Sequence, residues 1–519
     1  MKKKGEHLAM AFFKALKKKS SQFAVIDYGL PQPFRCSRQK LLLLSLKLAI
    51  QIRRSSRANR VGIVLPPGLG GIIANLGVFF AGKVPVNLNF SLGPVVTQKL
   101  MVRAEIDTII TAQKMMDKFP LFPWTKNVVE ISSWLKNLAK KPYLLLGEFF
   151  LLLLPLTLSR ILLRVPNKIF SEEATLLFTS GSSGEPKGVV LTHQNILSNC
   201  RQIEQLGLFE SDAKILANLP LFHSFGFTVA TCFPLLYNIP IICVSSPLDV
   251  KKGLEAICEE EITFLLGTPT FLRGFLNKGK KEDFKSIRFV IAGAEKSTDL
   301  FKNKWEEFAS CSYLEGYGLT ETSPGISFNL PGSGTRKGSV GRLFSEIECK
   351  TIHPESQEDL KFGESGLLCF RGPNIFSGYL NDRQKTEEVL MEDNWFITGD
   401  LGYLDEDKFL FIEGRLSRFS KIGGEMVPHV TIEESIQEIL SQQKGEECNL
   451  VIIGQPDQNK GEQLVLLIEQ EINFVNLRRE LSEKGLPNLW IPKKYQLVNE
   501  IPMLPSGKID FASLEDLIE

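Results

Sequence analysis

Short apolar runs that end in turn residues alternate with helical stretches over most of the first 400 residues. Five such runs are VGIVLPPG, KVPVNLN, TIITAQ, FLLGTPT and RFVIAGAE, at 61–68, 83–89, 108–113, 264–270 and 288–295. Continuous apolar runs of this length between helices are typical of buried parallel strands joined by crossover helices. The pattern predicts an α/β fold, with a large N-terminal domain of mixed sheets flanked by helices.

The pattern changes after about residue 400. GYLDEDKFLFIEGRLSR, at 402–418, reads as a hairpin that turns at Asp405–Asp407. A polar loop is expected to follow, and after it a helix at 431–443, strands at 449–454 and 463–469, and a second helix at 474–485. The pattern predicts a small α+β domain of about a hundred residues, a common domain size. We divide the chain into an N-terminal domain at 1–416 and a C-terminal domain at 417–519.

One apolar stretch stands apart, YLLLGEFFLLLLPLTLSRILL at 143–163. It approaches the ~20 residues that span a bilayer, but Glu148, Pro155 and Arg160 interrupt it. A spanning helix would also separate upstream strands from downstream motifs that we expect to share one site. Two alternatives remain, a buried core helix or an apolar patch at a membrane interface.

The N-terminus, MKKKGEHLAMAFFKALKKKS, predicts a basic amphipathic helix. Its apolar part is too short for a secretory signal, which has a longer apolar region and a small-residue cleavage site. The helix is either a solvated surface helix or a contact with anionic lipid.

Composition narrows the class of protein. The 519 residues carry a net charge of +2 and are 43% hydrophobic and 23% charged. This profile is typical of a globular protein and gives no field that would attract nucleic acid. The nine cysteines include no C-x-x-C pair, so we expect reduced thiols in a cytoplasmic protein.

The segment TSGSSGEPKGV, at 179–189, is rich in hydroxyls and glycines and lies between an apolar run and an expected helix. Its spacing does not fit the Walker loop, in which the lysine opens a helix and a hydroxyl follows it. Glycine backbone and hydroxyl groups nevertheless suit a phosphate. Taken alone, the segment is either a phosphate loop or an ordinary surface turn.

Other short motifs are weak one by one, because each also fits a turn or a buried polar group. In chain order they are PLFHSFGFTVAT around His223, IAGAEK around Glu295, YLEGYGLTETSPG around Tyr317, FITGDLGYLDED around Asp400, IEGRLSRFSKIGGEMV around Arg415 and LPSGKID around Lys508.

In this order, the motifs make the chain resemble the adenylate-forming superfamily, which contains acyl-CoA synthetases, luciferases and peptide-synthetase adenylation domains. The resemblance runs from roughly residue 20 to the C-terminus. It implies an enzyme that uses ATP and Mg²⁺ to activate a carboxylic acid as an acyl-adenylate. The substrate carboxylate is then the nucleophile, and catalysis is mainly positioning and charge stabilisation.

The resemblance also implies roles for individual residues. Tyr317 and Gly318 would lie against adenine, Asp400 and Arg415 at the ribose, and Thr320 at the α-phosphate. Glu321 would bind Mg²⁺. Residues implied at the remaining phosphates are Thr179, Ser180, Gly181, Ser182, Ser183, Gly184 and Lys187, and those at the edge of the base are Gly293, Ala294 and Glu295.

The remaining implied roles concern the acid and its acceptor. Lys508 would bridge the substrate carboxylate and the α-phosphate, and His223 would gate the acyl pocket. For thioester formation the C-terminal domain would rotate about Ser417. Lys421 and the pair Gly423–Gly424 would then line the channel for a phosphopantetheine thiol.

The sequence KIGGEMV resembles the synthetase half of the bacterial bifunctional 2-acylglycerophosphoethanolamine acyltransferase/acyl-carrier-protein synthetase, although Pro428–His429 departs from that pattern. No histidine is followed five residues later by an aspartate, as the acyltransferase half requires. Our first interpretation is therefore an acyl-acyl-carrier-protein synthetase for fatty acids, with acyl carrier protein as partner. It would be cytoplasmic, with peripheral contact to the inner face of a bacterial membrane as an option.

Three alternatives stay open. The first is a long-chain fatty acid–CoA ligase, which differs only in its thiol acceptor. The second is a non-catalytic acyl- or nucleotide-binding protein, against which Lys508, Glu321 and Asp400 argue. The third, an amino-acid-activating enzyme, is disfavoured because the segment after His223 is apolar and lacks an aspartate for an ammonium group.

Overall fold

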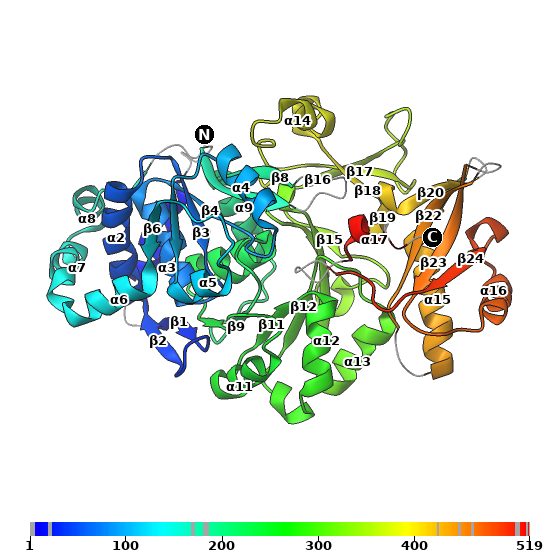
Figure 1. Ribbon diagram of the computed structural model, residues 1–519, viewed down its shortest axis with the longest axis horizontal. Coiled ribbons are helices and arrows are strands. Elements are labelled where there is room, and N and C mark those ends of the chain that lie inside the picture. The colour runs from blue at the N-terminus through cyan, green and yellow to red at the C-terminus, as the bar shows by residue number, and fades with distance from the viewer. Residues whose placement is uncertain are drawn as a thin grey trace.

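The computed structural model describes residues 6–18, 23–167, 172–179, 186–422, 425–444, 448–457, 461–503, 509–514 and 517. The largest sheet has the strand order β15-β14-β13-β12-β11-β9-β10-β1-β2 (Figure 1). Its strands are β1 (Phe23–Asp27), β2 (Phe34–Ser37), β9 (Ile215–Ala217), β10 (Ile241–Cys243), β11 (Phe264–Gly267), β12 (Phe289–Ala292), β13 (Ser312–Gly318), β14 (Gly325–Phe328) and β15 (Arg342–Leu343).

The six central strands of this sheet pair in parallel, and antiparallel strands close both edges. Side chains of a strand alternate between the two faces of a sheet. Along β11, Phe264 and Leu266 join one apolar cluster, whereas Leu265 joins another. Both faces are therefore covered, which explains why the run is continuously apolar.

A second parallel sheet has the order β4-β3-β5-β6, and a two-stranded hairpin, β7-β8, follows it in the chain. The bounds are β3 (Arg60–Val64), β4 (Val84–Asn87), β5 (Thr108–Thr111), β6 (Asn127–Glu130), β7 (Glu173–Thr179) and β8 (Lys187–Thr192). All five predicted apolar runs contain a parallel strand. The helix expected after the glycine-rich segment is present and begins at His193, but a strand that opens at Lys187 precedes it.

A third, antiparallel sheet consists of β16 (Glu348–Ile352), β17 (Gly366–Arg371), β18 (Phe396–Leu404) and β19 (Leu410–Arg415). The predicted hairpin at 402–418 is confirmed, since β18 and β19 pair antiparallel with Leu404 opposite Leu410. Asp405 starts the turn, and its carboxylate accepts hydrogen bonds from the backbone N–H groups of Asp407 and Phe409.

The C-terminal region forms a separate sheet of β20 (Phe419–Ile422), β21 (Glu425–Pro428), β22 (Leu450–Asp457), β23 (Gly461–Ile468) and β24 (Lys494–Leu497). Its helices are α15 (His429–Lys444), α16 (Phe474–Glu483) and α17 (Phe511–Leu514). The predicted strands and the two longer helices are confirmed. In Figure 1 this region forms the right-hand end of the molecule. The division between 416 and 417 stays a prediction.

The remaining helices lie within the first 400 residues of the chain. They are α1 (Leu8–Lys18), α2 (Arg38–Ser55), α3 (Leu69–Ala81), α4 (Pro94–Arg103), α5 (Gln113–Lys118), α6 (Ile131–Lys140), α7 (Leu146–Leu153), α8 (Leu156–Leu162), α9 (His193–Glu204), α10 (Phe233–Tyr237), α11 (Val250–Glu260), α12 (Pro269–Lys278), α13 (Asp299–Ala309) and α14 (Arg383–Val389).

The predicted N-terminal helix is α1, but it is not a solvated surface helix. Leu8, Phe12, Phe13 and Leu16 are almost fully buried and belong to the main apolar cluster. This apolar face is therefore already covered by protein and is not free to contact lipid.

The apolar stretch at 143–163 is not a buried core helix. It forms a short 3₁₀ turn, Pro142–Leu145, followed by α7 and α8, and most of its large apolar side chains are exposed. In the part of the chain that the structure describes, no helix is both long and apolar enough to cross a bilayer. The core-helix alternative was therefore wrong, and the other alternative, an apolar patch at a membrane interface, stays a prediction.

Two buried histidines join α1 to α9. The rings of His7 and His193 lie 3.6 Å apart between centroids, and the backbone N–H of Leu8 donates to Nδ1 of His193 at 3.4 Å. Burial, together with His7, lowers the pKa of His193 to about 3. His193 is therefore neutral in the folded protein, whereas it takes up a proton near its ordinary pKa when the chain unfolds.

This difference predicts a loss of stability in mild acid. Below the ordinary histidine pKa of about 6.5, the unfolded state binds a proton that the folded state does not bind. This difference lowers the free energy of unfolding by about 1.4 kcal/mol at pH 5.5. His193→Asn keeps an acceptor for Leu8 but does not titrate. In urea unfolding, the free energy of unfolding should fall less between pH 7.5 and pH 5.5 in this variant than in the parent, by about 1.4 kcal/mol. The exposed His353→Asn serves as the control, and an unchanged acid loss in His193→Asn would contradict the prediction.

Candidate active site

A buried carboxylate joins three strands of two different sheets. The hydroxyl of Tyr317 donates to Oδ2 of Asp400 at 2.5 Å, and Nε of Arg415 donates to Oδ1 at 3.0 Å. Asp400 is 3% exposed. Burial, reinforced by Asp400, raises the pKa of the Tyr317 hydroxyl well above its usual value, so this group stays a donor. A phenol ring, a carboxylate and a guanidinium thus meet at one point.

Backbone geometry explains how these residues meet. Asp400 and Arg415 lie opposite each other on β18 and β19, and Gly399 has φ of +76°, which glycine adopts without strain. After Tyr317 the chain turns sharply, because a Cβ on Gly318 would lie 1.9 Å from the carbonyl oxygen of Pro324. The motifs YGLTET and TGD therefore encode two tight backbone turns as well as side chains.

A second group of residues forms beside the first. The hydroxyl of Tyr379 donates to Oε1 of Glu321 at 2.9 Å, and Nζ of Lys187 lies 5.1 Å from the centre of the Tyr379 ring. Backbone hydrogen bonds hold the tyrosine there, because the N–H of Leu380 donates to the carbonyl of Gly188 at 2.7 Å. A cation from the glycine-rich hairpin and a carboxylate from a segment more than a hundred residues later therefore approach the same tyrosine.

Tyr379 is a residue that the sequence motifs did not identify. Burial and the neighbouring Glu321 raise the pKa of its hydroxyl, which keeps it protonated and donating. The signal in the sequence is slight, an aromatic residue after a glycine in the segment FSGYL. Only the pairing of this segment with β8 brings its ring to Lys187.

The turn at 293–295 follows β12 and faces a phenylalanine from a distant segment. Ala294 has φ of +72°, and an ideal Cβ on Gly293 would lie 3.5 Å from the ring of Phe225. The carboxylate of Glu295 accepts a hydrogen bond of 2.8 Å from the hydroxyl of Thr270. The turn therefore lies between β12 and the segment that follows His223, and the sequence motifs at these two places come together.

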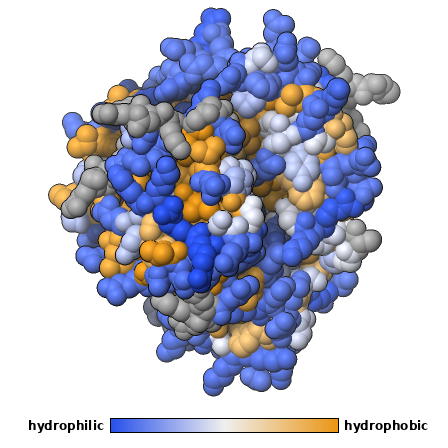
Figure 2. Space-filling view, turned by 90° about the vertical axis from the view of Figure 1, so that its right-hand side faces the viewer, coloured by the Kyte–Doolittle hydropathy of each residue, from blue (hydrophilic) through white to orange (hydrophobic). Residues whose placement is uncertain are grey.

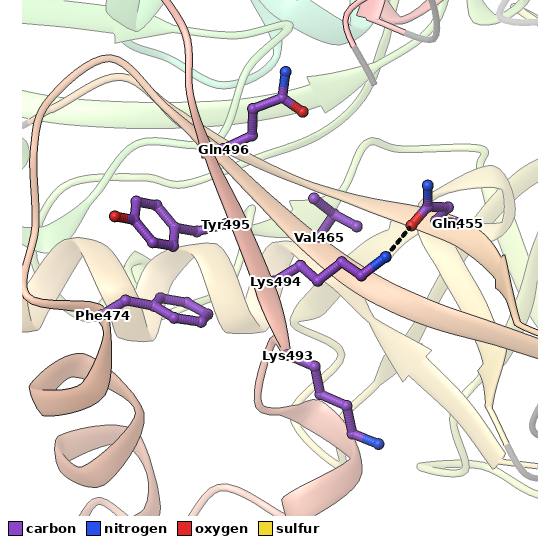
Figure 3. Close-up of a pocket in the computed structure, with 7 residues that line it drawn as sticks. All are labelled: Gln455, Val465, Phe474, Lys493, Lys494, Tyr495 and Gln496. Carbon is purple, nitrogen blue, oxygen red and sulfur yellow. Dashed lines mark hydrogen bonds between the residues drawn. The ribbon is translucent and has the colours of Figure 1, made fainter. Parts of the chain in front are cut away.

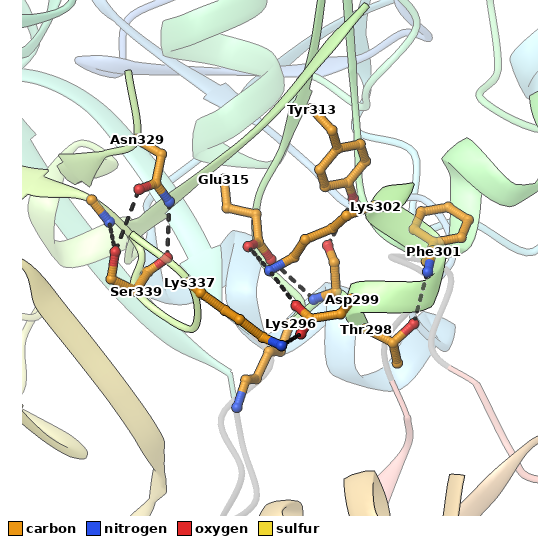
Figure 4. A network of polar contacts seen from close by, with 12 residues as sticks. Lys296, Thr298, Asp299, Phe301, Lys302, Tyr313, Glu315, Asn329, Lys337 and Ser339 are labelled. Atoms are coloured by element: carbon orange, nitrogen blue, oxygen red, sulfur yellow. Dashed lines mark hydrogen bonds and ion pairs between the residues drawn. The ribbon is translucent and has the colours of Figure 1, made fainter. Parts of the chain in front are cut away.

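A polar network anchors this turn (Figure 4). Lys302 pairs with Glu315 at 2.5 Å, and the backbone N–H of Ser297 donates to the same carboxylate at 3.1 Å. Beside it, Lys296 forms an ion pair of 2.6 Å with Glu434 of α15. The network thus connects the turn to β13 on one side and to the C-terminal region on the other.

His223 is half-buried at the start of an apolar segment, with its ring 5.0 Å from that of Phe222. A π-helical stretch, Phe225–Cys232, follows it, and Phe227, Thr228 and Cys232 there are buried. His223 therefore lies at the edge of a largely buried apolar segment.

The other predicted site residues are placed as follows, as far as the structure describes them. Lys421 lies on β20 and pairs with Glu355 at 2.8 Å. Thr320 is half-buried at the start of the turn that carries Glu321. Ser180, Gly181, Ser182, Ser183, Gly184 and Lys508 lie outside the described residues, and so does the pair Gly423–Gly424.

A shallow groove on the C-terminal sheet is distinct from the site (Figure 3). The rings of Phe474 and Tyr495 lie 4.7 Å apart, and Lys494 donates to Gln455 at 3.3 Å. None of the residues that line the groove belongs to the predicted site.

The residues present fit a nucleoside triphosphate and a magnesium ion. Asp400, beside Tyr317, has carboxylate oxygens that can accept from hydroxyl groups, and Lys187 adds positive charge at the ring of Tyr379. Mg²⁺ is commonly held by one or two carboxylates together with phosphate oxygens, so Glu321 alone suffices as the protein ligand.

Comparison with known proteins agrees with this geometry. Residues 12–380 match the sequence model of a family described as "AMP-binding enzyme". The chain is 28% identical to a long-chain-fatty-acid–CoA ligase from Bacillus subtilis over 508 residues, 90% of this chain and 88% of that protein. It is 32% identical to a mitochondrial medium-chain acyl-CoA ligase from Homo sapiens over 66% of this chain and 57% of that protein.

Solved structures show the same fold. ATP-bound MatB from Rhodopseudomonas palustris has a TM-score of 0.82 at 22% identity, covering 98% of both chains. The o-succinylbenzoate coenzyme A synthetase of Bacillus subtilis, in complex with ATP and magnesium, has a TM-score of 0.80 at 21% identity, covering 99% of this chain and 100% of that one. The predicted fold, with mixed N-terminal sheets and a small α+β C-terminal region, is confirmed.

The Tyr317–Asp400–Arg415 group yields a direct prediction for ATP binding. Asp400→Asn keeps the size of the side chain but removes its charge, so it loses a charged hydrogen bond of about 1.5–3 kcal/mol. The KM for ATP in ATP–pyrophosphate exchange should rise about tenfold to a hundredfold. Asp407→Asn, on the same hairpin but 60% exposed, is the matched control. A KM that stays within twofold of the parent would show that Asp400 does not contact the nucleotide.

Proposed function

The chain belongs to the AMP-binding enzyme family, and we propose that it is an AMP-forming acid–thiol ligase that activates fatty acids. In the first step an oxygen of the substrate carboxylate attacks the α-phosphorus of ATP, and pyrophosphate leaves. In the second step a thiol sulfur attacks the acyl carbon, and AMP leaves. The observation that carries the proposal is the meeting of the Tyr317–Asp400–Arg415 group with the Lys187–Tyr379–Glu321 group.

The first group suits the nucleoside. The Tyr317 ring would stack on adenine beside Gly318, and the turn of Gly293, Ala294 and Glu295 would edge the base. Asp400 would accept hydrogen bonds from the ribose hydroxyls. Arg415 would neutralise its charge and add donors there. Because Asp400 is already held by two partners, little ordering is left to do when the ribose arrives.

The second group suits the phosphates. Lys187 and Thr179 flank the hairpin loop and lie opposite each other on β8 and β7, so a loop of Ser180, Gly181, Ser182, Ser183 and Gly184 would enclose the β- and γ-phosphates. A bound Mg²⁺ would neutralise phosphate charge, with Glu321 as its ligand and Tyr379 orienting that carboxylate. Thr320 and Lys508 would stabilise charge at the α-phosphate.

The acid is proposed to be apolar. The segment after His223 is a buried apolar π-helix that packs toward the turn at 293–295, and it offers no acidic partner for an amino group. His223 would gate this pocket. Relatives named for long-chain fatty acids and for medium-chain acyl groups support the same class of substrate.

The two half-reactions would use two orientations of the C-terminal region, and the contacts of two arginines support a hinge between them. Arg415 binds Asp400 of β18, whereas Nη1 of Arg418 donates to the carbonyl of Ile452 on β22 at 2.7 Å. Only Leu416 and Ser417 separate these anchors, and Ser417 is exposed. Rotation there would move Lys508 away from the α-phosphate and bring Lys421 and the Gly423–Gly424 pair to the site for the thiol.

Two thiol acceptors are considered. The comparisons favour coenzyme A, the alternative in the sequence analysis, because the similar proteins are named as CoA ligases. Acyl carrier protein, our first interpretation, keeps the support of the segment KIGGEMV alone. Both acceptors present the same phosphopantetheine thiol, so the chemistry of the site does not differ between them.

One assay tests the proposal and separates the acceptors. Purified protein is incubated with ATP, Mg²⁺ and palmitate, and with either coenzyme A or holo-acyl carrier protein. We expect palmitate-dependent pyrophosphate release in both reactions and faster thioester formation with coenzyme A. Thioester formed on carrier protein alone would reverse the choice of acceptor. If palmitate and shorter fatty acids release no pyrophosphate, the proposed function is wrong.

The hinge gives a separate prediction. Ser417→Pro fixes φ at this position and restricts Leu416, so it should hold one orientation of the C-terminal region. One half-reaction should continue while the other slows at least about tenfold, a barrier change of about 1.4 kcal/mol. Pyrophosphate exchange reports the first half-reaction, and thioester formation from supplied acyl-adenylate reports the second. Ser417→Ala is the control, and equal effects on both half-reactions would exclude Ser417 as the hinge.

A further inference from the structure

The two short helices α7 and α8 carry an unusual concentration of exposed apolar side chains. Of the 21 large hydrophobic residues that are exposed in the described chain, nine lie between 143 and 162. They are Tyr143, Leu144, Leu146, Phe150, Leu153, Leu156, Leu158, Ile161 and Leu162. We call this set the apolar patch. Scattered exposed leucines need no explanation, but a contiguous group of this kind marks an interaction surface.

The polarity of these helices is inverted relative to an ordinary surface helix. Along α7, the exposed Leu146, Phe150 and Leu153 follow helical spacing on one face, and the buried Glu148 and Leu152 share another. Glu148 faces α2, where Lys47 pairs with its Oε1 at 3.1 Å. A charged residue is thus turned toward the protein while phenylalanine and leucine face solvent.

The helix α8 repeats this inversion. Ser159 is fully buried, whereas Leu158, Ile161 and Leu162 are exposed. Nζ of Lys17 at the end of α1 donates to Oγ of Ser159 at 2.9 Å and to the carbonyl of Leu154 at 2.6 Å. Two lysines of the protein body therefore hold the polar side of the helix pair inward, and this fixes the apolar patch outward.

The segment of the chain that carries the apolar patch is basic. Between residues 131 and 167 the basic residues are Lys136, Lys140, Lys141, Arg160 and Arg164, and Glu148 is the one acidic residue. Its charge is buried and paired with Lys47. Lys136, Lys140, Lys141 and Arg164 are exposed. This rim would repel a second copy of the same surface and attract an anionic one.

The position of the helix pair leaves the rest of the enzyme free. In Figure 1, α7 and α8 lie at the left-hand end of the molecule, and the C-terminal sheet lies at the right-hand end. Figure 2 looks onto that right-hand end, which is mostly hydrophilic with smaller hydrophobic areas between. A flat partner bound at α7 and α8 would therefore not cover the C-terminal region.

We propose that the apolar patch and its basic rim dock the protein on an anionic lipid bilayer. The helices α7 and α8 have eight and seven residues, too few to span a bilayer, which needs about 20. They would lie in the interface with Phe150, Leu153 and Ile161 among the acyl chains and the lysines at the headgroups. The proposal rests on these surfaces and does not depend on the proposed reaction.

Vesicle co-sedimentation without ATP tests the proposal. The parent protein should bind vesicles that contain phosphatidylglycerol more tightly than vesicles of pure phosphatidylcholine. The triple variant Phe150→Ser, Leu153→Ser, Ile161→Ser should lose at least about 100-fold in binding to the anionic vesicles. A matched triple variant, Val95→Ser, Leu248→Ser, Val475→Ser, removes equally exposed apolar groups elsewhere and should bind like the parent.

A second variant tests separately whether the positive charge of the basic rim contributes to vesicle binding. Lys136→Glu, Lys140→Glu, Lys141→Glu changes only exposed positions and should lose at least about 30-fold on anionic vesicles, with little change on neutral ones. Thermal unfolding and pyrophosphate exchange should match the parent in all variants, which excludes misfolding.

Two outcomes would overturn the proposal. One is a parent protein that does not bind anionic vesicles, or a serine variant at the apolar patch that binds them like the parent. The other is a parent that forms dimers in sedimentation velocity while the serine variant is monomeric and vesicle binding is unchanged. That second result would assign the apolar patch to a second copy of the chain.

Discussion

The arrangement of the site depends on one buried carboxylate. Asp400 is almost inaccessible to solvent, and a buried charge is costly unless it is paired and hydrogen-bonded. Its partners come from β13 of the large sheet and from the end of β19, the last strand before the C-terminal region. The need to satisfy this charge therefore joins three segments that are far apart in sequence. Arg415 is thereby held to β18, so in the proposed rotation the hinge would follow this residue.

Ion pairs and hydrogen bonds also set the orientation of other carboxylates and of two helices. Tyr379 orients Glu321, and Lys302 with Ser297 orients Glu315 beneath the turn at 293–295. The same principle holds α7 and α8, where Lys47 and Lys17 turn polar groups inward. In each case the polar contact fixes which side of a segment faces the rest of the protein.

These contacts differ in how they relate to the reaction. Under the proposed function, those around Asp400 and Glu321 hold charges in place for a nucleotide, so their loss is expected to weaken ATP binding. The contacts of Lys47 and Lys17 hold an apolar surface outward, which under the docking proposal would place the protein at a bilayer. The proposed fatty-acid ligase would gain from both, because its acid substrate would partition into lipid while ATP stays in water.

The sequence by itself determined the parallel strands, the hairpin at 402–418, the C-terminal elements and the motifs of the site, because these depend on local periodicity and turn residues. It did not determine that Lys187 opens a strand, that Tyr379 joins Glu321, or that α1 is buried. Nor did it decide whether 143–163 faces the core or solvent, since an apolar helix reads the same in either place. Those outcomes depend on contacts between distant segments, such as Lys17 with Ser159 and Leu380 with Gly188. Only the tertiary structure decides such contacts, because hydrogen-bond partners are set by the whole fold and not by neighbours in the chain.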